Sequence, residues 1–352
     1  MGDSINIRDV AREARVGLGT VSRVLNNHPS VSEETRQRVQ EAIRLLHYRP
    51  SAQARRLVKG STDTICFILS NREFLKTFHA RILQGVQSFI STTDYQIIYI
   101  PISYQPQIPP SAITLPRIIT YRDAVDGVIV AGTNYPNFLA ALEEIRVPYV
   151  VFGNNMIGDV PDRRVDAVSF DEEGGAYEAT KHLVDLGHRD IWFLGNTALP
   201  WFRDRFNGYL RAVSDHDLRG RWITESDTKD NVQFGSLAIS QAIERDPEVT
   251  AVVTGNDHVA YGVWKGLREL GVAMPDDISV VGFDDTELCY LTDPPLTSVS
   301  VHNEEVGAEC ARMLLDKLHD PGKRFRERVL STELIPRGST GPVCTARAAA
   351  GA

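Results

Sequence analysis

The chain has 352 residues, of which 42% are hydrophobic and 24% charged, a composition that indicates two or three globular domains and excludes wholesale disorder. No apolar run approaches the ~18 residues that cross a bilayer, and no export signal begins the chain, so we expect a cytoplasmic protein without a membrane partner. Residues 1–60 hold eleven Lys or Arg and six Asp or Glu, a net charge of +5, so the remainder of this −8 chain carries −13.

The first predicted elements are three short helices within residues 1–50. Asn6 can cap a helix whose apolar side chains recur every three or four residues between Ile7 and Ala14. A break at residues 15–17 separates it from a second short helix, and Ser32, followed by two glutamates, begins the third. Three short helices with a tight turn between the first two are typical of a helix-turn-helix module, and the basic charge of this segment favours a nucleic-acid partner.

From Thr64 onward, short apolar runs alternate with amphipathic helical stretches. The runs lie at residues 65–69, 95–100, 126–132, 148–153, 190–195, 250–255 and 278–283. Near-continuous apolar strands separated by helices predict parallel sheets that are covered on both faces. There are too many such units for one small sheet, so we expect two doubly wound subdomains, with a ligand crevice at the ends of the strands.

The sequence has none of the common catalytic or metal-binding motifs. It lacks the phosphate-binding G-x-x-x-x-G-K-[ST], the nucleophile elbow G-x-S-x-G and the zinc motif H-E-x-x-H. The four cysteines are scattered without a C-x-x-C pair, at Cys66, Cys289, Cys310 and Cys344. We therefore expect no enzyme activity, no cofactor and no metal site.

A series of longer motifs runs through nearly the whole chain. The N-terminal segment contains IRDVA, TVSRVLN, VSEETRQRV, YRP and the A-x-A-R-x-L of residues 52–57, and the body contains HLVDLGHRDIWFLG, RFNGY, GNDHVAYG, ISVVGFDDTE, DPPLTSV and TELIPRGST. In these motifs the chain resembles the LacI/GalR family of bacterial transcription regulators. Residues 101–123 and the last ten residues are the parts without this similarity.

The resemblance implies an N-terminal all-α helix-turn-helix head with a hinge helix, followed by an α/β periplasmic-binding-protein-like (type I) body of two doubly wound parallel-sheet subdomains. We assign four segments: the DNA-binding head, the hinge helix and linker, the effector-binding and dimerisation domain, and a disordered tail, at residues 1–50, 51–61, 62–340 and 341–352. Chain crossovers between the subdomains are expected near residues 160–168, 292–298 and 321–328.

The resemblance also places the second helix in the major groove of DNA, with its first residues toward the base edges. It implies DNA contacts on this helix, on the YRP motif and on the hinge, at Leu18, Gly19, Thr20, Ser22, Arg23, Asn26, Tyr48, Ala54, Arg55 and Leu57. We expect Leu18 to contact a thymine methyl group, whereas Gly19 has no side chain to offer. The alternative for Thr20 and Asn26 is that they only cap turns.

In the hinge, Leu57 would enter a base step of the minor groove and kink the duplex, and the small Ala54 would let two hinges pack across a dimer axis. The alternative is a plain linker helix that Leu57 packs against the body. Arg15 and Gly17 stand where many family members have Gly and Ser. Because a non-Gly residue in a left-handed turn costs about 1 kcal/mol, Arg15 is expected to weaken the head slightly without abolishing its fold.

In the body, the resemblance implies that the effector contacts are Phe74, Asn154, Trp201, Arg205, Asn256 and Asp284. An arginine supplies a fork of donors and an aspartate a pair of acceptors, which together can fix neighbouring hydroxyl groups. The alternative is a structural salt bridge between Arg205 and Asp284. Asp257 is expected to cap the following helix, and Asn154 can replace the acidic ligand residue that several relatives carry at the position of Gly153.

We therefore predict a ligand-responsive DNA-binding transcription regulator, located in the cytoplasm on the nucleoid. It would repress carbohydrate-utilisation genes, bind a pseudo-palindromic double-stranded DNA operator as a homodimer, and respond to a small sugar in the cleft between the subdomains. The alternatives are a regulator with a purine or phosphorylated corepressor and, less favoured, a solute-binding protein without a regulatory role.

Overall fold

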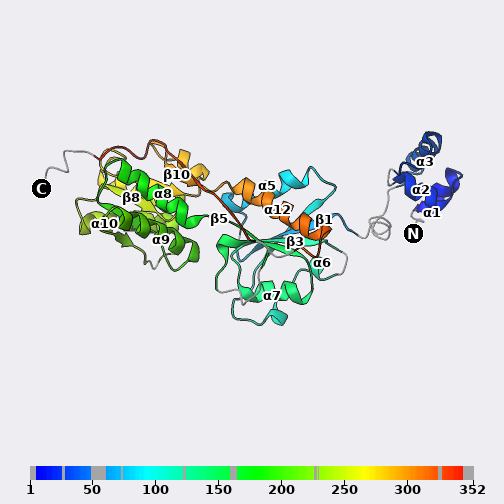
Figure 1. Cartoon of the computed structure of the whole chain (residues 1–352), viewed down its shortest axis with the longest axis horizontal. Coiled ribbons are helices and arrows are strands. Elements are labelled where there is room, and N and C mark those ends of the chain that lie inside the picture. The colour runs from blue at the N-terminus through cyan, green and yellow to red at the C-terminus, as the bar shows by residue number, and fades with distance from the viewer. Residues whose placement is uncertain are drawn as a thin grey trace. The chain divides into compact units, whose positions relative to one another are not determined.

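The structure is a computed structural model of the chain. It describes residues 5–25, 28–48, 61–72, 74–121, 124–158, 165–225, 228, 230–323 and 327–343, which fall into two compact units, Met1–Thr62 and Asp63–Ala352 (Figure 1). The predicted DNA contacts Asn26, Ala54, Arg55 and Leu57 lie outside the described residues, as do most of the predicted hinge and tail.

The N-terminal unit consists of three helices, α1 (Ile7–Glu13), α2 (Leu18–Leu25) and α3 (Glu33–Leu45). The side chain of Asn6 accepts a hydrogen bond from the Arg8 N–H and thereby caps α1, as its sequence predicts. Ser32 caps α3 in the same way, by accepting from the Thr35 N–H.

One fully buried valine from each helix meets in the core of this unit: Val10 from α1, Val21 from α2 and Val39 from α3. The apolar spacing in the sequence therefore does bring the three helices around a common core. The predicted helix-turn-helix head is confirmed.

The first subdomain of the larger unit contains a six-stranded parallel sheet in the order β11-β5-β4-β3-β1-β2. Its strands, in chain order, are β1 (Thr64–Ser70), β2 (Gln96–Ile102), β3 (Gly127–Gly132), β4 (Tyr149–Phe152), β5 (Ala167–Phe170) and β11 (Glu327–Leu330). The α-helices of this subdomain are α5 (Thr77–Ile90), α6 (Arg117–Thr120), α7 (Pro136–Glu144) and α12 (Asn303–His319), with short 3-10 turns at Pro110–Ala112 and Gly153–Asn155.

Helices cover both faces of this sheet, with α5 and α12 on one side and α7 on the other (Figure 1). Successive side chains of a strand point to opposite faces. Accordingly, Phe67 of β1 packs with Ile82 of α5, whereas its neighbour Ile68 packs with Phe138 of α7. Both faces of β1 are therefore buried, which explains why this strand reads as a continuous apolar run.

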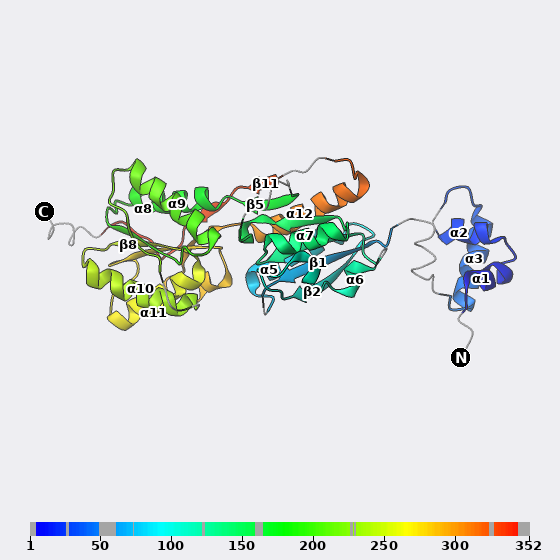
Figure 2. The same cartoon turned by 90° about the horizontal axis from the view of Figure 1, so that it is seen from below.

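The second subdomain has a six-stranded sheet in the order β12-β10-β9-β8-β6-β7, parallel except for β12. Its strands are β6 (Ile191–Leu194), β7 (Arg221–Ile223), β8 (Ala251–Thr254), β9 (Ser279–Phe283), β10 (Thr297–Ser300) and β12 (Glu333–Ile335). The helices α8 (Glu172–Asp185) and α9 (Pro200–Asp215) cover one face, and α10 (Asn231–Arg245) and α11 (Asp257–Leu270) cover the other (Figure 2). A 3-10 turn at Glu287–Tyr290 follows β9. The predicted pair of doubly wound subdomains is thus confirmed.

The chain passes between the two sheets three times, and each passage follows a strand directly. The passages lie after Phe170 at the end of β5, after Ser300 at the end of β10 and after Leu330 at the end of β11. Each lies later than the segments expected from the sequence, residues 160–168, 292–298 and 321–328. The reason is strand pairing: β5 pairs with β4, β10 with β9 and β11 with β5, so each strand completes one sheet before the chain leaves it.

Among the described residues, no helix is both long and apolar enough to span a membrane. The same part of the chain contains no group of three or more His, Cys, Asp or Glu that could hold a metal ion. The described cysteines, Cys66, Cys289 and Cys310, are free and buried.

Candidate functional site

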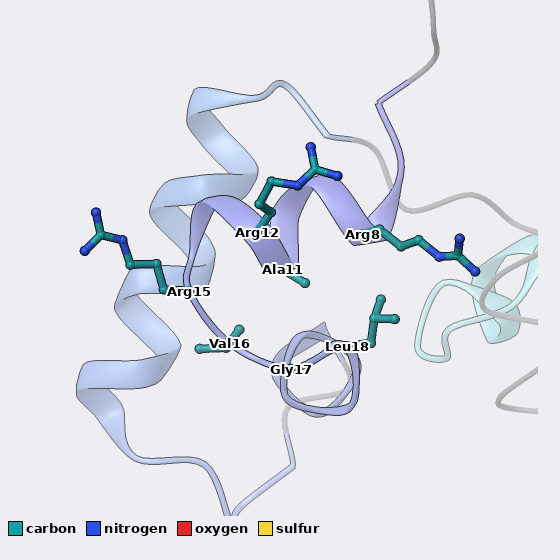
Figure 3. Close-up of a pocket in the computed structure, with 7 residues that line it drawn as sticks. All are labelled: Arg8, Ala11, Arg12, Arg15, Val16, Gly17 and Leu18. Atoms are coloured by element: carbon teal, nitrogen blue, oxygen red, sulfur yellow. The ribbon is translucent and has the colours of Figure 1, made fainter.

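The first candidate surface is a hollow of about 540 Å³ on the head, between α1 and the start of α2 (Figure 3). It is lined by Arg8, Ala11, Arg12, Arg15, Val16, Gly17 and Leu18. The three arginine side chains are exposed to solvent, so this surface carries the positive charge that a DNA phosphate backbone attracts. Of these residues, only Leu18 was expected to contact DNA, although arginines recur at positions 8, 12 and 15 of the sequence.

The DNA contacts expected on α2 lie on the sides of that helix that the head core does not use. Val21 and Val24 are buried, while Leu18 is 45% exposed and Arg23 is also exposed. Gly19 is exposed, and Ser22 and Thr20 are half-buried. Thr20 is the third residue of α2, so it does not cap the start of this helix.

Tyr48 differs from the other expected DNA contacts, because it is only 7% exposed and packs in the core of the head. A left-handed residue, His47 (φ 49°), turns the chain back after α3, and the Tyr48 N–H donates to the carbonyl of Ile43 at 3.0 Å. Burial raises the pKa of the Tyr48 hydroxyl. Tyr48 therefore contributes to packing of the head, and the DNA contact predicted for it stays a prediction.

The second candidate site surrounds Arg205, which lies in α9 and is 3% exposed. Its Nε donates to Glu172 at 2.5 Å, its Nη1 to the carbonyl of Gly255 at 2.6 Å and its Nη2 to Asp284 at 2.9 Å. The guanidinium also lies over the ring of Phe283, 3.8 Å from the ring centroid. The salt bridge considered as an alternative role for Arg205 and Asp284 is thus present, and it joins α9 to the ends of β8 and β9.

Two buried carboxylates, those of Glu172 and Asp284, share the guanidinium of Arg205, and the pKa values of all three groups are shifted. Burial raises the pKa of Glu172 to about 7, although Arg205 opposes the shift. Burial also raises the pKa of Asp284, again against the effect of Arg205. Burial by itself would lower the pKa of Arg205, but the two carboxylates raise it, so the arginine stays charged.

Asp284 also has an unusual backbone conformation, with a φ of 102°. This is the left-handed region that favours glycine, and residues held there against their preference cluster at ligand sites. The left-handed backbone of Asp284 is therefore a second indication, independent of the buried ion pair, that this position is functional.

Glu172 was not among the residues that the sequence pointed to. At the sequence level it is one of two acidic residues in the first turn of a helix, which is where acids are common because of the helix dipole. Its link to a predicted residue is Asn154, whose Nδ2 donates to Glu172 at 3.1 Å. Asn154 also exchanges hydrogen bonds with the backbone of Phe170, so it joins the end of β4 to the end of β5.

The helix cap expected of Asp257 is provided by Asn256, whose predicted effector contact stays a prediction. Asn256 has the extended backbone of a cap residue, and its side chain accepts from the Val259 N–H at 3.0 Å, so it caps α11. Asp257, expected to be the cap, is the first helical residue and is fully buried. It accepts hydrogen bonds from the backbone and hydroxyl of Thr286 and from the hydroxyl of Ser298. Burial, with Asp284 nearby, raises the pKa of Asp257 to about 7.

The two expected aromatic contacts, Trp201 and Phe74, differ in burial. It is 9% exposed, and the guanidinium of Arg72 lies over its ring at 5.7 Å from the centroid. Phe74 lies in the segment between β1 and α5 and is 71% exposed. Arg72, which follows β1, was also missed by the sequence. Its Nε is buried and has no hydrogen-bond partner within the described chain.

Comparison with known proteins identifies both units. Residues 6–51 match the model of the bacterial regulatory proteins of the lacI family, and residues 180–340 match that of a periplasmic binding protein-like domain. Similar proteins include the HTH-type transcriptional regulator CelR of Thermobifida fusca, which is 33% identical over 94% of this chain and 96% of its own. The HTH-type transcriptional repressor CytR of Escherichia coli is 30% identical over 95% of this chain and 96% of its own.

Solved structures of transcription regulators resemble this chain over nearly its whole length. A complex of the transcriptional regulator CelR with cellobiose is 30% identical, has a TM-score of 0.67 and covers 95% of this chain and 99% of its own. A Lac repressor dimer bound to operator and the anti-inducer ONPF has a TM-score of 0.76 at 24% identity, over 96% of this chain and all of its own, and shows the same fold.

Proposed function

The chain belongs to the LacI family of bacterial transcription regulators, and from that premise we propose that it represses carbohydrate-utilisation genes in response to a small neutral sugar. Its relatives are transcription regulators and not enzymes, so the chain is itself a regulator. It acts on DNA in the cytoplasm, at the nucleoid. Because one recognition helix reads only a half-site, it binds a pseudo-palindromic operator as a homodimer.

The observation that carries the sugar proposal is the buried cluster of Arg205, Glu172 and Asp284. Its groups converge at the carboxyl ends of parallel strands, which is where open α/β sheets bind ligands. Donors and acceptors fixed in this way suit the hydroxyl groups of a sugar, and Trp201 supplies an aromatic face beside them. The relative CelR has been solved with cellobiose, which supports the same class of ligand.

The charge of the cluster favours a neutral ligand over a phosphorylated one. The charge of Arg205 is already matched by two carboxylates, Glu172 and Asp284, and Asp257, a third buried carboxylate, lies near Asp284. A phosphate placed here would meet several carboxylates and only one guanidinium, which is already paired. A phosphorylated corepressor is therefore the less favoured effector.

On the DNA side, α2 lies in the major groove. Leu18 contacts a thymine methyl group, while Thr20, Ser22 and Arg23 contact phosphates and base edges. The hinge residues Ala54, Arg55 and Leu57 complete the contact in the minor groove. The sugar acts through its differential affinity for two conformations of the body that bind operator unequally.

Thermal unfolding of the purified protein tests this proposal, with cellobiose, other mono- and disaccharides, sugar phosphates and purines as probes. A ligand at ~100 times its dissociation constant stabilises by ~2.7 kcal/mol, a shift of several degrees. We expect a neutral sugar to shift the transition of the wild type but not that of Asp284→Asn. The control is Asp185→Asn, which removes an exposed surface carboxylate in the same subdomain and should leave the shift intact.

Other results would contradict specific parts of the proposal. A shift with purines or sugar phosphates alone would replace the neutral sugar with another class of effector. The absence of any shift across the panel would remove the claim of effector control and leave only the DNA-binding function.

A further inference from the structure

The first turn of the recognition helix α2 has very few side chains with which to read bases. Gly17 and Gly19 flank Leu18, and a Cβ added at either glycine would meet nothing within 4 Å, so the space in front of them is open. Leu18 can contact a methyl group but cannot form hydrogen bonds with base edges. In helix-turn-helix proteins the N-terminal residues of this helix make the base contacts, and here a neighbouring element can add hydrogen-bonding groups to the hydroxyl of Thr20.

The neighbouring element is α1, which lines the same hollow as Leu18 with Arg8 and Arg12, while Arg15 follows it in the turn. Figure 3 shows Arg8 and Leu18 projecting on the same side of the hollow, whereas Arg12 and Arg15 project away from Leu18. Arg12 forms an exposed ion pair with Asp9 at 3.5 Å. Within residues 5–25 and 28–48, no ion pair holds the side chain of Arg8.

We infer that Arg8 reads a guanine in the major groove, next to the base pair that Leu18 contacts, and that Arg12 and Arg15 bind flanking phosphates. This inference rests on the proposed placement of α2 in the major groove. The open space at Gly17 and Gly19 lets the helix approach the base edges closely, which brings a long side chain from α1 within reach of them.

The chemistry of the guanidinium determines the base. Arginine has five donors in a rigid fork and no acceptor. In the major groove, guanine presents two adjacent acceptors, O6 and N7, so it accepts both prongs of the fork, whereas adenine presents one acceptor and one donor. A glutamine at the same position has one donor and one acceptor side by side and therefore prefers adenine.

The test is selection of duplexes from a random-sequence DNA library by the full-length protein, in parallel for the wild type, Arg8→Ala, Arg8→Gln and the matched control Arg12→Ala. The wild type should enrich a guanine at one position of each half-site. Arg8→Ala should lose this preference by about tenfold while keeping the rest of the site. Arg8→Gln should change the preference to adenine, a result that a merely structural role for Arg8 would not produce.

Arg12→Ala should select the same sequences as the wild type. Its affinity should fall equally for all of them, and the slope of log affinity against log salt should fall by about 0.9 for the lost phosphate contact. If Arg8→Ala and Arg8→Gln also select the wild-type sequences and only bind them more weakly, Arg8 is a phosphate contact and the inference is wrong, while the proposed function stands. If the wild type enriches no sequence, both the groove placement of α2 and this inference are overturned.

Discussion

The Nη2 atom of Arg205 lies 2.9 Å from Oδ1 of Asp284, inside the protein and at a carboxylate whose backbone φ of 102° is unusual for any residue except glycine. The arginine has a second carboxylate partner in Glu172, so the cluster has more negative than positive groups. Removing its members one at a time should therefore have unequal effects on stability.

Arg205→Met should destabilise the body by about 3–5 kcal/mol, because it leaves two buried carboxylates without their shared cation. Glu172→Gln should cost clearly less, since Arg205 keeps Asp284 and the excess of negative charge disappears. Urea unfolding of both variants measures the two free energies. Equal losses would show that the shared guanidinium does not dominate the energetics of this cluster.

The same cluster predicts a pH dependence. The pKa of Glu172 is about 7 in the folded protein and near its ordinary value of 4.5 in the unfolded chain. The folded state therefore binds more protons between these two values, and the contribution of Glu172 to stability falls as the pH rises from about 4.5 to 7. We expect the melting temperature of the wild type to fall relative to that of Glu172→Gln as the pH rises from 5 to 8, because only the wild type has a carboxyl group at residue 172 that loses its proton over this range. A constant difference across this range would contradict the buried, proton-binding carboxylate.

His79 should affect the pH dependence of stability in the opposite direction to Glu172. It is buried beside Asn155, and burial, together with the charge of Arg72, lowers its pKa from 6.5 to about 3. The folded state binds fewer protons than the unfolded chain between these values, so stability is lost as the pH falls below about 6.5. His79→Gln should flatten the acid side of the stability profile in the same measurement. If the acid side is unchanged in this variant, other groups govern it.

Arg15 is expected to lower the stability of the head and to strengthen its binding to DNA. It holds a left-handed conformation (φ 56°) in the turn between α1 and α2, where a glycine pays no steric cost. Arg15→Gly should stabilise the head by about 1 kcal/mol and at the same time weaken DNA binding, because it removes a guanidinium from the hollow. Arg12→Ala, the control, should weaken DNA binding without stabilising the head. Chemical unfolding and a DNA titration separate the two effects, and an unchanged unfolding midpoint for Arg15→Gly would contradict the strain argument.

Gly85 allows two helices of the first subdomain to touch backbone to backbone. A Cβ at this residue would lie 1.9 Å from the carbonyl oxygen of Glu304, so α5 and α12 would have to move apart. Gly85→Ala should therefore cost about 1–3 kcal/mol or more in unfolding free energy. Gln84→Ala, at an exposed position of the same helix, should have little effect. Similar unfolding curves for the two variants would indicate that α5 and α12 can separate without loss.

The sequence predicted best those strands that form a continuous apolar run, most of which are buried on both faces, together with the partly exposed β2. The apolar runs correspond to β1, β2, β3, β4, β6, β8 and β9. The sequence missed β5, β7, β10, β11 and β12. The strands β5 (AVSF) and β10 (TSVS) contain serine between their apolar residues and so form no apolar run. The short strands β7, β11 and β12 are at least partly exposed and are held at or near the sheet edges by strand pairing. Their existence depends on a partner strand far away in the chain, which no local pattern contains.

The residues of the candidate site also divide into those that the sequence predicted and those that it missed. Arg205 and Asp284 stand in motifs that could be recognised, and the structure brings them together. Glu172 and Arg72 have ordinary charged neighbours in the sequence, and their burial arises only when distant strands and helices assemble around them. The expectation that Asp257 caps α11 is wrong for a similar reason, because the partners of Asp257 are Thr286 and Ser298, about thirty to forty residues away.

The three passages between the sheets have a consequence for the synthesis of the protein. The first sheet obtains its outer strand β11 and its covering helix α12 only from residues 303–330, after the whole second sheet except β12 has been made. While the chain is still attached to the ribosome, the face of the first sheet that α12 covers is without its helix. Domains of a nascent chain usually fold from the N-terminus onward, but here neither subdomain can be completed before residues 303–335 have been synthesised.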